Sequence, residues 1–369
     1  MLTAILGGAA GLIGVAATGA LGYRASRRRR ASRLLRLDSP RALAEDHFLP
    51  IGGIEQWVGI RGEDRRNPVL LVLHGGPGSP YSVFTPLLRC WERYFTVVQW
   101  DRRGAGKTLG RNGKARSGEM SFGRMVEDAI LLCDFLRSHL GQPRLVLLAS
   151  SAGTPIGLRL ILRRPELFAA FVGTDLNVGM AAVEAVAFPA TLAWARAAKD
   201  RKALALLTRM GSDPARWDVA SFNRLMRLRD RTVTVGRGLG ATFGPLMLGS
   251  PQHGLGDVMD AISGLAFSTE QLFEELHAFD ARSLGQRFEV PFFVFHGDAD
   301  VFTPAAAVQA YVAEVQAPVK HFELLRGSGH LGAFMHPEPF LALLRQHVLP
   351  VVAAAGAERE PTSFPGALL

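Results

Sequence analysis

The chain has 369 residues, 48% of them hydrophobic, with 40 glycines and 21 prolines, which suits one large α/β domain with an insertion or two domains. A net charge of +9 would favour nucleic-acid binding if it were spread over the fold, but much of it lies between Arg24 and Arg36. Because the charge is concentrated there and the chain has no helix-turn-helix, zinc-finger or RNA-binding signature, the sequence argues against a nucleic-acid partner. Cys90 and Cys133 lack metal-ligand spacing and are expected to be buried free thiols.

The N-terminal stretch from Leu2 to Gly22 carries no charge and would form about 30 Å of helix, enough to span a bilayer. Arginines follow this stretch, whereas a cleaved signal peptide has its positive charge before the apolar run. We therefore expect a membrane protein with a single-pass N-terminal anchor and the domain that follows it in the cytoplasm. Gly7 and Gly11 would let two such helices pair as a homodimer. The alternative is a peripheral or signal-like segment.

Buried strands alternate with amphipathic helices along the rest of the chain. A helix is expected from Ser121, as its N-cap, to Leu140, with Gly141 as its stop. This alternation predicts an α/β fold with a doubly wound, mostly parallel sheet and active loops at the carboxyl ends of the strands. The predicted strands are Gln56–Ile60, Pro68–Leu73, Phe95–Trp100, Arg144–Leu148, Phe168–Val172, Pro291–His296 and His321–Leu325.

Between about Thr174 and Phe288 the sequence shows only helical patterns, such as 181–199 and 203–210, which predicts a helical cap inserted into the sheet domain. A closing helix is expected over 337–348. The predicted organisation is an anchor at 1–23, a basic linker at 24–46, core at 47–174, cap at 175–288, core again at 289–350, and a disordered tail at 351–369.

The stretch from Arg144 to Leu158, RLVLLASSAGTPIGL, has the form of a strand, a tight turn of small residues and a helix. A nucleophile elbow requires this arrangement, with small residues two positions to either side of the serine. Ala149 and Gly153 meet that requirement and make Ser151 the candidate nucleophile. Taken alone, the stretch could also be an ordinary turn.

Two later loops supply the partners that a nucleophilic serine needs. Asp300 follows one buried strand, and His330 lies in a glycine-rich loop after the next. Each has an ordinary alternative, as a turn-forming aspartate or a structural histidine. Together, in the chain order serine, acid, histidine, they predict a catalytic triad of Ser151, Asp300 and His330.

The loop His74-Gly-Gly-Pro-Gly78 follows a buried strand and is expected to form the oxyanion hole. The amides of Gly76 and Ala152 are the expected donors, and His74 and Gly75 are assigned to substrate binding. A simple turn is the alternative.

The run from Gly104 to Thr108, GAGKT, resembles the end of a phosphate-binding loop. Asp101 stands where that motif needs its first glycine, which argues against nucleotide binding.

These motifs resemble the α/β-hydrolase superfamily and, within it, proline iminopeptidase-like serine hydrolases. The resemblance covers about Glu55 to Leu349, including Trp100-Asp-Arg-Arg-Gly-Ala-Gly106. It implies an eight-stranded sheet, a helical cap over the site, no metal or other cofactor, and release of an N-terminal residue, often proline, from small peptides. Glu184 matches a family glutamate that would bind the substrate's amine, although Val183 and Leu176 depart from the family pattern. The alternative for Glu184 is an exposed helix residue.

The sequence therefore predicts a serine hydrolase with an acyl-enzyme intermediate, first of all an aminopeptidase. An esterase or lipase acting on acyl esters is the second reading, favoured by the predicted anchor and the apolar cap. A catalytically silent binding module is the third.

Overall fold

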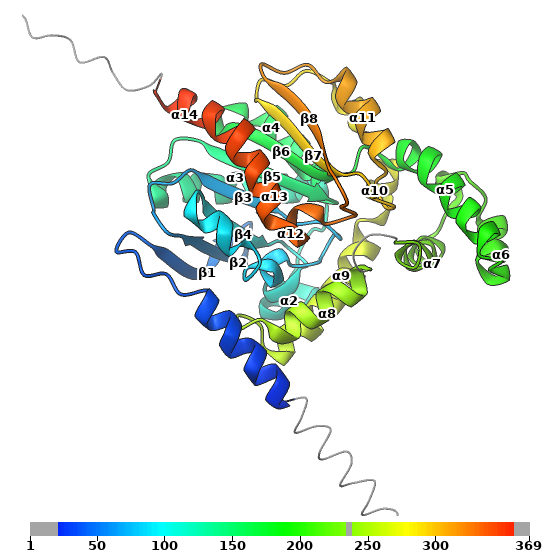
Figure 1. Cartoon of the computed structure of the whole chain (residues 1–369), viewed down its shortest axis with the longest axis horizontal. Coiled ribbons are helices and arrows are strands. Elements are labelled where there is room, and N and C mark those ends of the chain that lie inside the picture. The colour runs from blue at the N-terminus through cyan, green and yellow to red at the C-terminus, as the bar shows by residue number, and fades with distance from the viewer. Residues whose placement is uncertain (1–20, 234–237, 358–369) are drawn as a thin grey trace, which may run out of the picture.

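The computed structural model describes residues 21–233 and 238–357, and an eight-stranded sheet runs through its centre (Figure 1). The strand order is β1-β2-β4-β3-β5-β6-β7-β8. β1 pairs with β2, and β2 with β4, in antiparallel fashion, whereas every other neighbouring pair is parallel. The predicted mostly parallel sheet is confirmed. The strands are β1 Leu43–Ile51, β2 Ile54–Gly62, β3 Val69–Leu73, β4 Thr96–Asp101, β5 Leu145–Ser151, β6 Phe168–Leu176, β7 Phe292–Gly297 and β8 Lys320–Leu325.

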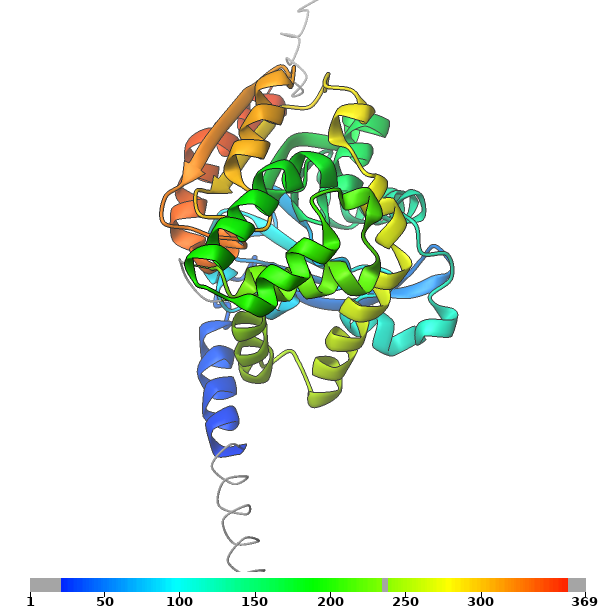
Figure 2. The same cartoon turned by 90° about the vertical axis from the view of Figure 1, so that its right-hand side faces the viewer.

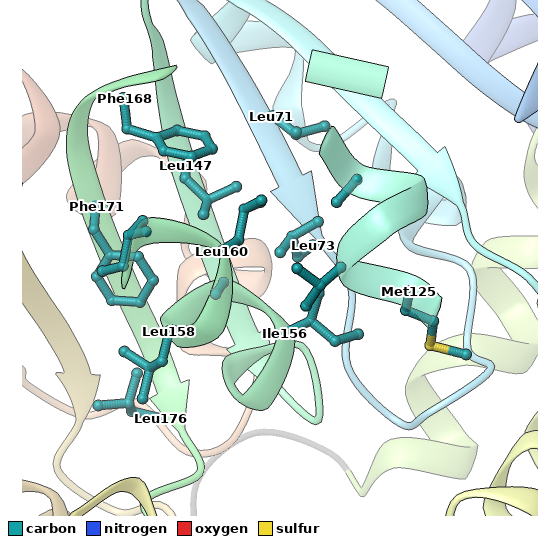
Figure 3. Packing of buried hydrophobic residues seen from close by; sticks show 14 of the residues in the cluster. Leu71, Leu73, Met125, Leu147, Ile156, Leu158, Leu160, Phe168, Phe171 and Leu176 are labelled. Atoms are coloured by element: carbon teal, nitrogen blue, oxygen red, sulfur yellow. The ribbon is translucent and has the colours of Figure 1, made fainter. Parts of the chain in front are cut away.

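Helices cover both faces of the sheet, which explains why its inner strands are continuous apolar runs. Along β5, Leu147 points into one apolar cluster and Val146 into the other. Figure 3 shows the first cluster, in which Leu147 and Phe171 pack around α4. Burying each such side chain contributes roughly 1.5–3 kcal/mol. The first face carries α3 Phe122–Leu140, α4 Thr154–Arg163 and α11 Ala305–Glu314; the second carries η1 Tyr81–Phe84, η2 Leu88–Arg93, α12 Gly332–Met335, α13 Pro337–Leu343 and the π-helical turn η7 Leu344–Val348.

Helix α3 begins and ends where its sequence predicts. The Ser121 hydroxyl accepts a hydrogen bond from the Arg124 amide at 3.0 Å, satisfying one of the free donors of the first turn. Gly141 ends the helix in the left-handed conformation, with φ +64°. Both predicted signals are confirmed.

A set of helices separates β6 from β7 and lies on the side of the sheet toward which the parallel strands run (Figures 1 and 2). Part of this set has an apolar cluster of its own, to which Phe188 and Leu225 belong. We call these helices the cap. They are α5 Met180–Ala197, α6 Arg201–Met210, α7 Val219–Asp230, α8 Leu239–Gly249, α9 Leu255–Gln271 and α10 Phe273–Ala278.

Strand β1 lies partly where the sequence predicts a linker. Its residues alternate between half-buried and exposed positions, but two of the half-buried ones are polar, Glu45 and His47. Their side chains bond to each other at 2.8 Å, and Glu45 also meets His139 of α3 at 2.7 Å. The polar pair hides the apolar alternation by which an edge strand is recognised.

No helix within the described ranges is long and apolar enough to cross a membrane. This finding corrects the predicted localisation, a single-pass anchor holding the catalytic domain at a membrane, and removes the support for a homodimer through that anchor. Residues 1–20 of the predicted anchor lie outside the described residues. Residues 21–34 form a helix that carries the arginines, and charged side chains are costly in a bilayer core.

The two ends of the described chain are helical. Arg28 in the N-terminal helix donates to the carbonyl of Pro251 at 2.9 Å, and Arg24 donates to that of His253 at 3.3 Å, so this helix packs beside α8 (Figures 1 and 2). At the other end, Leu349–Ala357 forms α14, which extends into the stretch expected to be a disordered tail. Residues 358–369 of that tail lie outside the described part.

Candidate functional site

Ser151 stands at the end of β5, where the chain turns sharply into α4. Its φ of +51° lies in the left-handed region, which a residue with a side chain adopts only when its surroundings impose it. The turn is tight because the chain on its far side touches β3: a Cβ on Gly153 would lie 2.5 Å from the Leu73 carbonyl oxygen. The small residues in this stretch are therefore a steric requirement.

The structure brings the three residues of the predicted triad together. His330 Nε2 lies 3.2 Å from Ser151 Oγ, and His330 Nδ1 lies 2.8 Å from Asp300 Oδ2. Asp300 follows β7 and His330 follows β8, so loops after three parallel strands meet at one edge of the sheet. The imidazole can accept the serine proton at one nitrogen while the carboxylate holds the other.

Asp300 is held as an anion by groups of its own loop. Its Oδ1 accepts hydrogen bonds from the amides of Phe302 and Thr303 at 2.8 and 3.0 Å, and Oδ2 accepts one from the Thr303 hydroxyl at 2.8 Å. Burial alone would raise the pKa of Asp300, but His330 and these donors outweigh it and lower that pKa. Burial likewise opposes protonation of His330, while the Asp300 carboxylate raises the pKa of the imidazole.

The loop after β3 lies against Ser151. A Cβ on Gly75 would come within 2.7 Å of the Ser151 Cβ and of the Tyr81 hydroxyl, and Gly76 has φ +38°. Both positions therefore require glycine. Within the described residues, the amides of Gly76 and Ala152 donate to no protein group, so both remain available to an oxyanion.

Helix α9 of the cap rests directly on this loop. Its Gly264 meets the carbonyl of Gly78, and a Cβ on Gly264 would lie 2.9 Å from the Gly104 carbonyl oxygen. The Ser268 hydroxyl donates to the same Gly104 carbonyl at 2.9 Å. The cap is thus joined to the predicted oxyanion loop by backbone contact.

The sequence predicts a substrate-binding role for His74, but the structure buries its ring beneath the loop. Its Nδ1 donates to the Gly75 carbonyl at 3.0 Å, and its Nε2 accepts from the Arg102 amide at 3.4 Å. Burial lowers the pKa of His74 well below its ordinary value, and the Arg102 guanidinium adds to this effect. In this structure the ring supports the loop from behind.

The GAGKT stretch does not present a phosphate cradle. The Asp101 carboxylate accepts the Lys107 amide at 2.9 Å, where a phosphate-binding loop would leave its amide free. Burial raises the pKa of Asp101 to about 7. Next to it, Arg103 pairs with the buried Asp128 at 2.9 Å and fixes the loop to α3. The GAGKT stretch and the residues before it therefore have a structural role.

Glu184 lies in α5 of the cap, and its side chain is 2% exposed, which excludes the alternative of an exposed helix residue. Both of its carboxylate oxygens bind the Arg229 guanidinium of α7, with Nη1 to Oε1 at 2.6 Å. Arg229 is fully buried and also donates to Thr191 at 3.2 Å. The carboxylate expected to meet a substrate amine is already paired with a cation.

Some polar residues at the site escaped the sequence reasoning. Asp175, at the end of β6, and Ser150 are both buried. His296, at the end of β7, donates to the Thr303 carbonyl at 2.7 Å and lies 3.6 Å from Asp300. Polar residues at the ends of adjacent buried strands were the available signal.

Two groups of histidine and glutamate have spacings that could hold a metal ion. Each involves an edge strand, β1 or β8, and in each the histidines lie within 3.4 Å of the glutamate. They are Glu45 with His47 and His139, and Glu323 with His321 and His347. Neither group includes a residue of the triad.

Comparisons with known proteins agree with this architecture. The model of the α/β-hydrolase fold family matches residues 68–337. Among curated proteins, the chain is 29% identical over 307 residues to a probable aminopeptidase, YbaC, of Bacillus subtilis, covering 81% of this chain and 94% of that protein.

Many solved structures share the fold. The proline iminopeptidase-related protein TTHA1809 from Thermus thermophilus superposes with a TM-score of 0.61 at 20% identity, covering 85% of this chain and 99% of the other. The proline iminopeptidase of Mycobacterium smegmatis gives a TM-score of 0.56 at 19% identity, covering 85% and 100%. The chain belongs to the α/β-hydrolase fold family and is a hydrolase.

Proposed function

We propose that this hydrolase uses Ser151 as its nucleophile, His330 as general base and acid, and Asp300 as the residue that orients His330. The observation that carries the proposal is the continuous hydrogen-bond path from Asp300 through His330 to Ser151, with lengths of 2.8 and 3.2 Å. A base within hydrogen-bond reach of a hydroxyl, itself held by a buried carboxylate, is the arrangement that activates a serine.

The reaction proceeds through an acyl-enzyme. His330 Nε2 takes the Ser151 proton as Oγ attacks the acyl carbon, and the amides of Gly76 and Ala152 donate to the resulting oxyanion. His330 then gives the proton to the leaving group, and the acyl group stays on Ser151. A water molecule deprotonated by His330 attacks the acyl carbon, and the returning proton frees the serine.

The first candidate substrate is a small peptide with a free N-terminus. This candidate is supported by the similarity to the probable aminopeptidase of Bacillus subtilis over most of both chains. In this proposal Glu184 would serve the substrate amine only if Arg229 released it.

The second candidate substrate is a carboxylic ester, which needs no amine-binding carboxylate. The observation that favours it is the pairing of Glu184 with Arg229, which neutralises the carboxylate that an aminopeptidase would use.

A fluorophosphonate probe tests the nucleophile, because it labels only an activated serine. We expect the purified protein to be labelled and Ser151→Ala to remain unlabelled. Absence of labelling in the folded protein would overturn the proposal in favour of a silent binding module. Parallel assays with a proline arylamide and a short-chain aryl ester separate the substrates: a higher kcat/KM for the arylamide supports the peptidase, and turnover of the ester alone supports the esterase.

A further inference from the structure

Asp175 links the two loops that carry the nucleophile and the base. It lies at the end of β6 with its side chain fully buried. Its Oδ2 accepts a hydrogen bond from the hydroxyl of Ser150, the residue before the nucleophile, at 3.0 Å. Its Oδ1 accepts one from the amide of Leu331, the residue after His330, at 3.0 Å. One carboxylate thus bridges the flanks of both reacting side chains.

The hydrogen bonds around Asp175 fit its ionised form. Ser150 gives its proton to Asp175, so it accepts a hydrogen bond from the Tyr81 hydroxyl, which lies 3.0 Å away. Both Asp175 oxygens then act as acceptors, as the oxygens of an ionised carboxylate do. The chain of bonds runs from Tyr81 through Ser150 and Asp175 to the backbone beside His330.

Backbone strain gathers at the same place. Ser151, Asp175 and Leu331 have φ of +51°, +50° and +66°, and the other non-glycine residue with positive φ in the described chain, Lys199, lies in the cap. Such conformations cost roughly 1–3 kcal/mol each and persist only where surrounding contacts impose them. The two hydrogen bonds of Asp175 are contacts of this kind, since each reaches the neighbour of a strained residue or the strained residue itself.

Asp175 is also a second negative charge beside the base. One of its oxygens, one oxygen of Asp300 and one ring nitrogen of His330 all lie within 4.8 Å of one another. Burial raises the pKa of Asp175, and the nearby His330 opposes that rise. The polar and titratable groups that face Asp175 and His330 are Asp300, His296, Tyr81, Ser150 and Ser151.

We propose that Asp175 is a positioning residue for the reaction: it fastens the His330 loop to the nucleophile elbow and shares with Asp300 the charge of the protonated His330. This inference rests on the proposed function. When His330 takes the Ser151 proton, the new imidazolium lies beside two carboxylates, and the Leu331 tether keeps Nε2 within reach of Oγ.

The test is Asp175→Asn, whose amide oxygen can still accept from Leu331 while the charge is gone. We expect kcat on the ester or arylamide that the enzyme turns over to fall on the order of tenfold or more. In the pH profile of kcat/KM, the acid limb follows the fraction of His330 that is neutral. Loss of a neighbouring anion lowers the pKa of His330. The limb should therefore move to lower pH, by about one pH unit. A purely structural role would leave it in place.

Asp298→Asn is the matched control. Asp298 also ties the His330 loop, by accepting the Ser328 amide at 3.2 Å, but it is partly exposed and is not among the groups that face His330. The acid limb should stay where it is in this variant. If Asp175→Asn matches the wild type in both kcat and acid limb, the inference is overturned.

Ser150→Ala covers the case in which Asp175→Asn does not fold. It removes one donor to Asp175 without touching the charge, so we expect kcat to fall roughly threefold to tenfold with the melting temperature little changed. An unchanged kcat in Ser150→Ala overturns the tether. Fluorophosphonate labelling of the wild type keeps the two proposals apart: if the wild type is not labelled, the proposed function fails; if it is labelled and these variants behave like it, only the role of Asp175 fails.

Discussion

The loops at the strand ends and the helical cap both bury charged side chains, but they compensate them differently. In the loops, Asp300 and Asp175 are held by backbone amides, hydroxyls and one imidazole. In the cap, Glu184 and Arg229 neutralise each other through two hydrogen bonds. A charge held by neutral donors can still stabilise a proton that moves beside it. A charge paired with an opposite charge is already neutralised, and its role is structural.

The largest effect that tests this comparison is expected at the strand ends. Asp300→Asn keeps the shape of the side chain but removes the charge that is proposed to orient His330, so kcat should fall roughly 10³- to 10⁴-fold, while substrate binding is retained. Steady-state kinetics on the better of the two substrates measures it, with the melting temperature as a check on folding. A loss of less than tenfold would mean that Asp300 does not orient the base.

The Glu184–Arg229 pair of the cap should affect the free energy of unfolding. Arg229→Met leaves the buried Glu184 without a cation, and breaking a buried pair in this way costs about 3–5 kcal/mol. Hydrogen exchange of the amides in α5 and α7 measures the local loss, and Glu184→Met added to Arg229→Met should recover much of it.

Arg231→Met is the matched control in the same cap. Its salt bridge to Asp200, at 2.7 Å, has an arginine side chain that is 60% exposed, and exposed pairs contribute about 0–1 kcal/mol. Equal losses in the two variants would contradict the distinction between a buried and an exposed pair.

The junction between the cap and the sheet domain should be sensitive to acid. His253, after α8, bonds to Ser82 of η1 at 3.1 Å, and burial lowers the pKa of the imidazole to about 4, with Lys107 adding to the effect. Because the folded pKa lies below the unfolded value of 6.5, the contribution to stability is present above pH 6.5 and is lost as pH falls toward 4. The loss is about 3 kcal/mol.

His253→Asn isolates this contribution from that of the carboxylates. The difference in unfolding free energy between the wild type and the variant, measured at pH 7 and at pH 4.5, should shrink at the lower pH. A difference that stays constant between the two would show that His253 does not charge on unfolding.

The smallest effect compares two N-caps of the same kind. Ser121→Ala removes the N-cap hydrogen bond of α3 in the sheet domain. Asp218→Ala removes that of α7, where the carboxylate accepts the Ser221 amide at 2.7 Å. Each should cost about 1 kcal/mol. Denaturant unfolding resolves whether the cap helices melt with the sheet: the two variants should then lower the same transition, whereas two separate transitions would show that the cap unfolds by itself.

The convergence of the strand-end residues could be predicted because it follows from a local sequence pattern. Ser151, Asp300 and His330 each follow a buried apolar run, and parallel strands bring such loops to one edge of the sheet. Glu184 could not be predicted in the same way. Its partner Arg229 lies on another helix of the cap, and the contact depends on how α5 and α7 pack, which no short stretch of sequence specifies.

Two other features were hidden for different reasons. Strand β1 carries Glu45 and His47 on its inner face, and their mutual pairing masks the alternation of an edge strand. Asp175 lies at the end of a buried strand, and no residue near it in the sequence indicates that its carboxylate accepts the amide of Leu331, 156 positions later. Both depend on contacts across the fold.

Gly264 shows how a residue outside the proposed triad can determine the geometry of the candidate site. The residue has no side chain and belongs to a helix that carries none of the triad, yet a single added methyl group would press on the Gly78 and Gly104 carbonyls. Such a substitution would displace the loop that carries the proposed oxyanion amides while leaving Ser151, Asp300 and His330 unchanged. In a screen for inactive variants, a substitution at position 264 would therefore resemble the loss of a catalytic residue, although the role of Gly264 is purely steric.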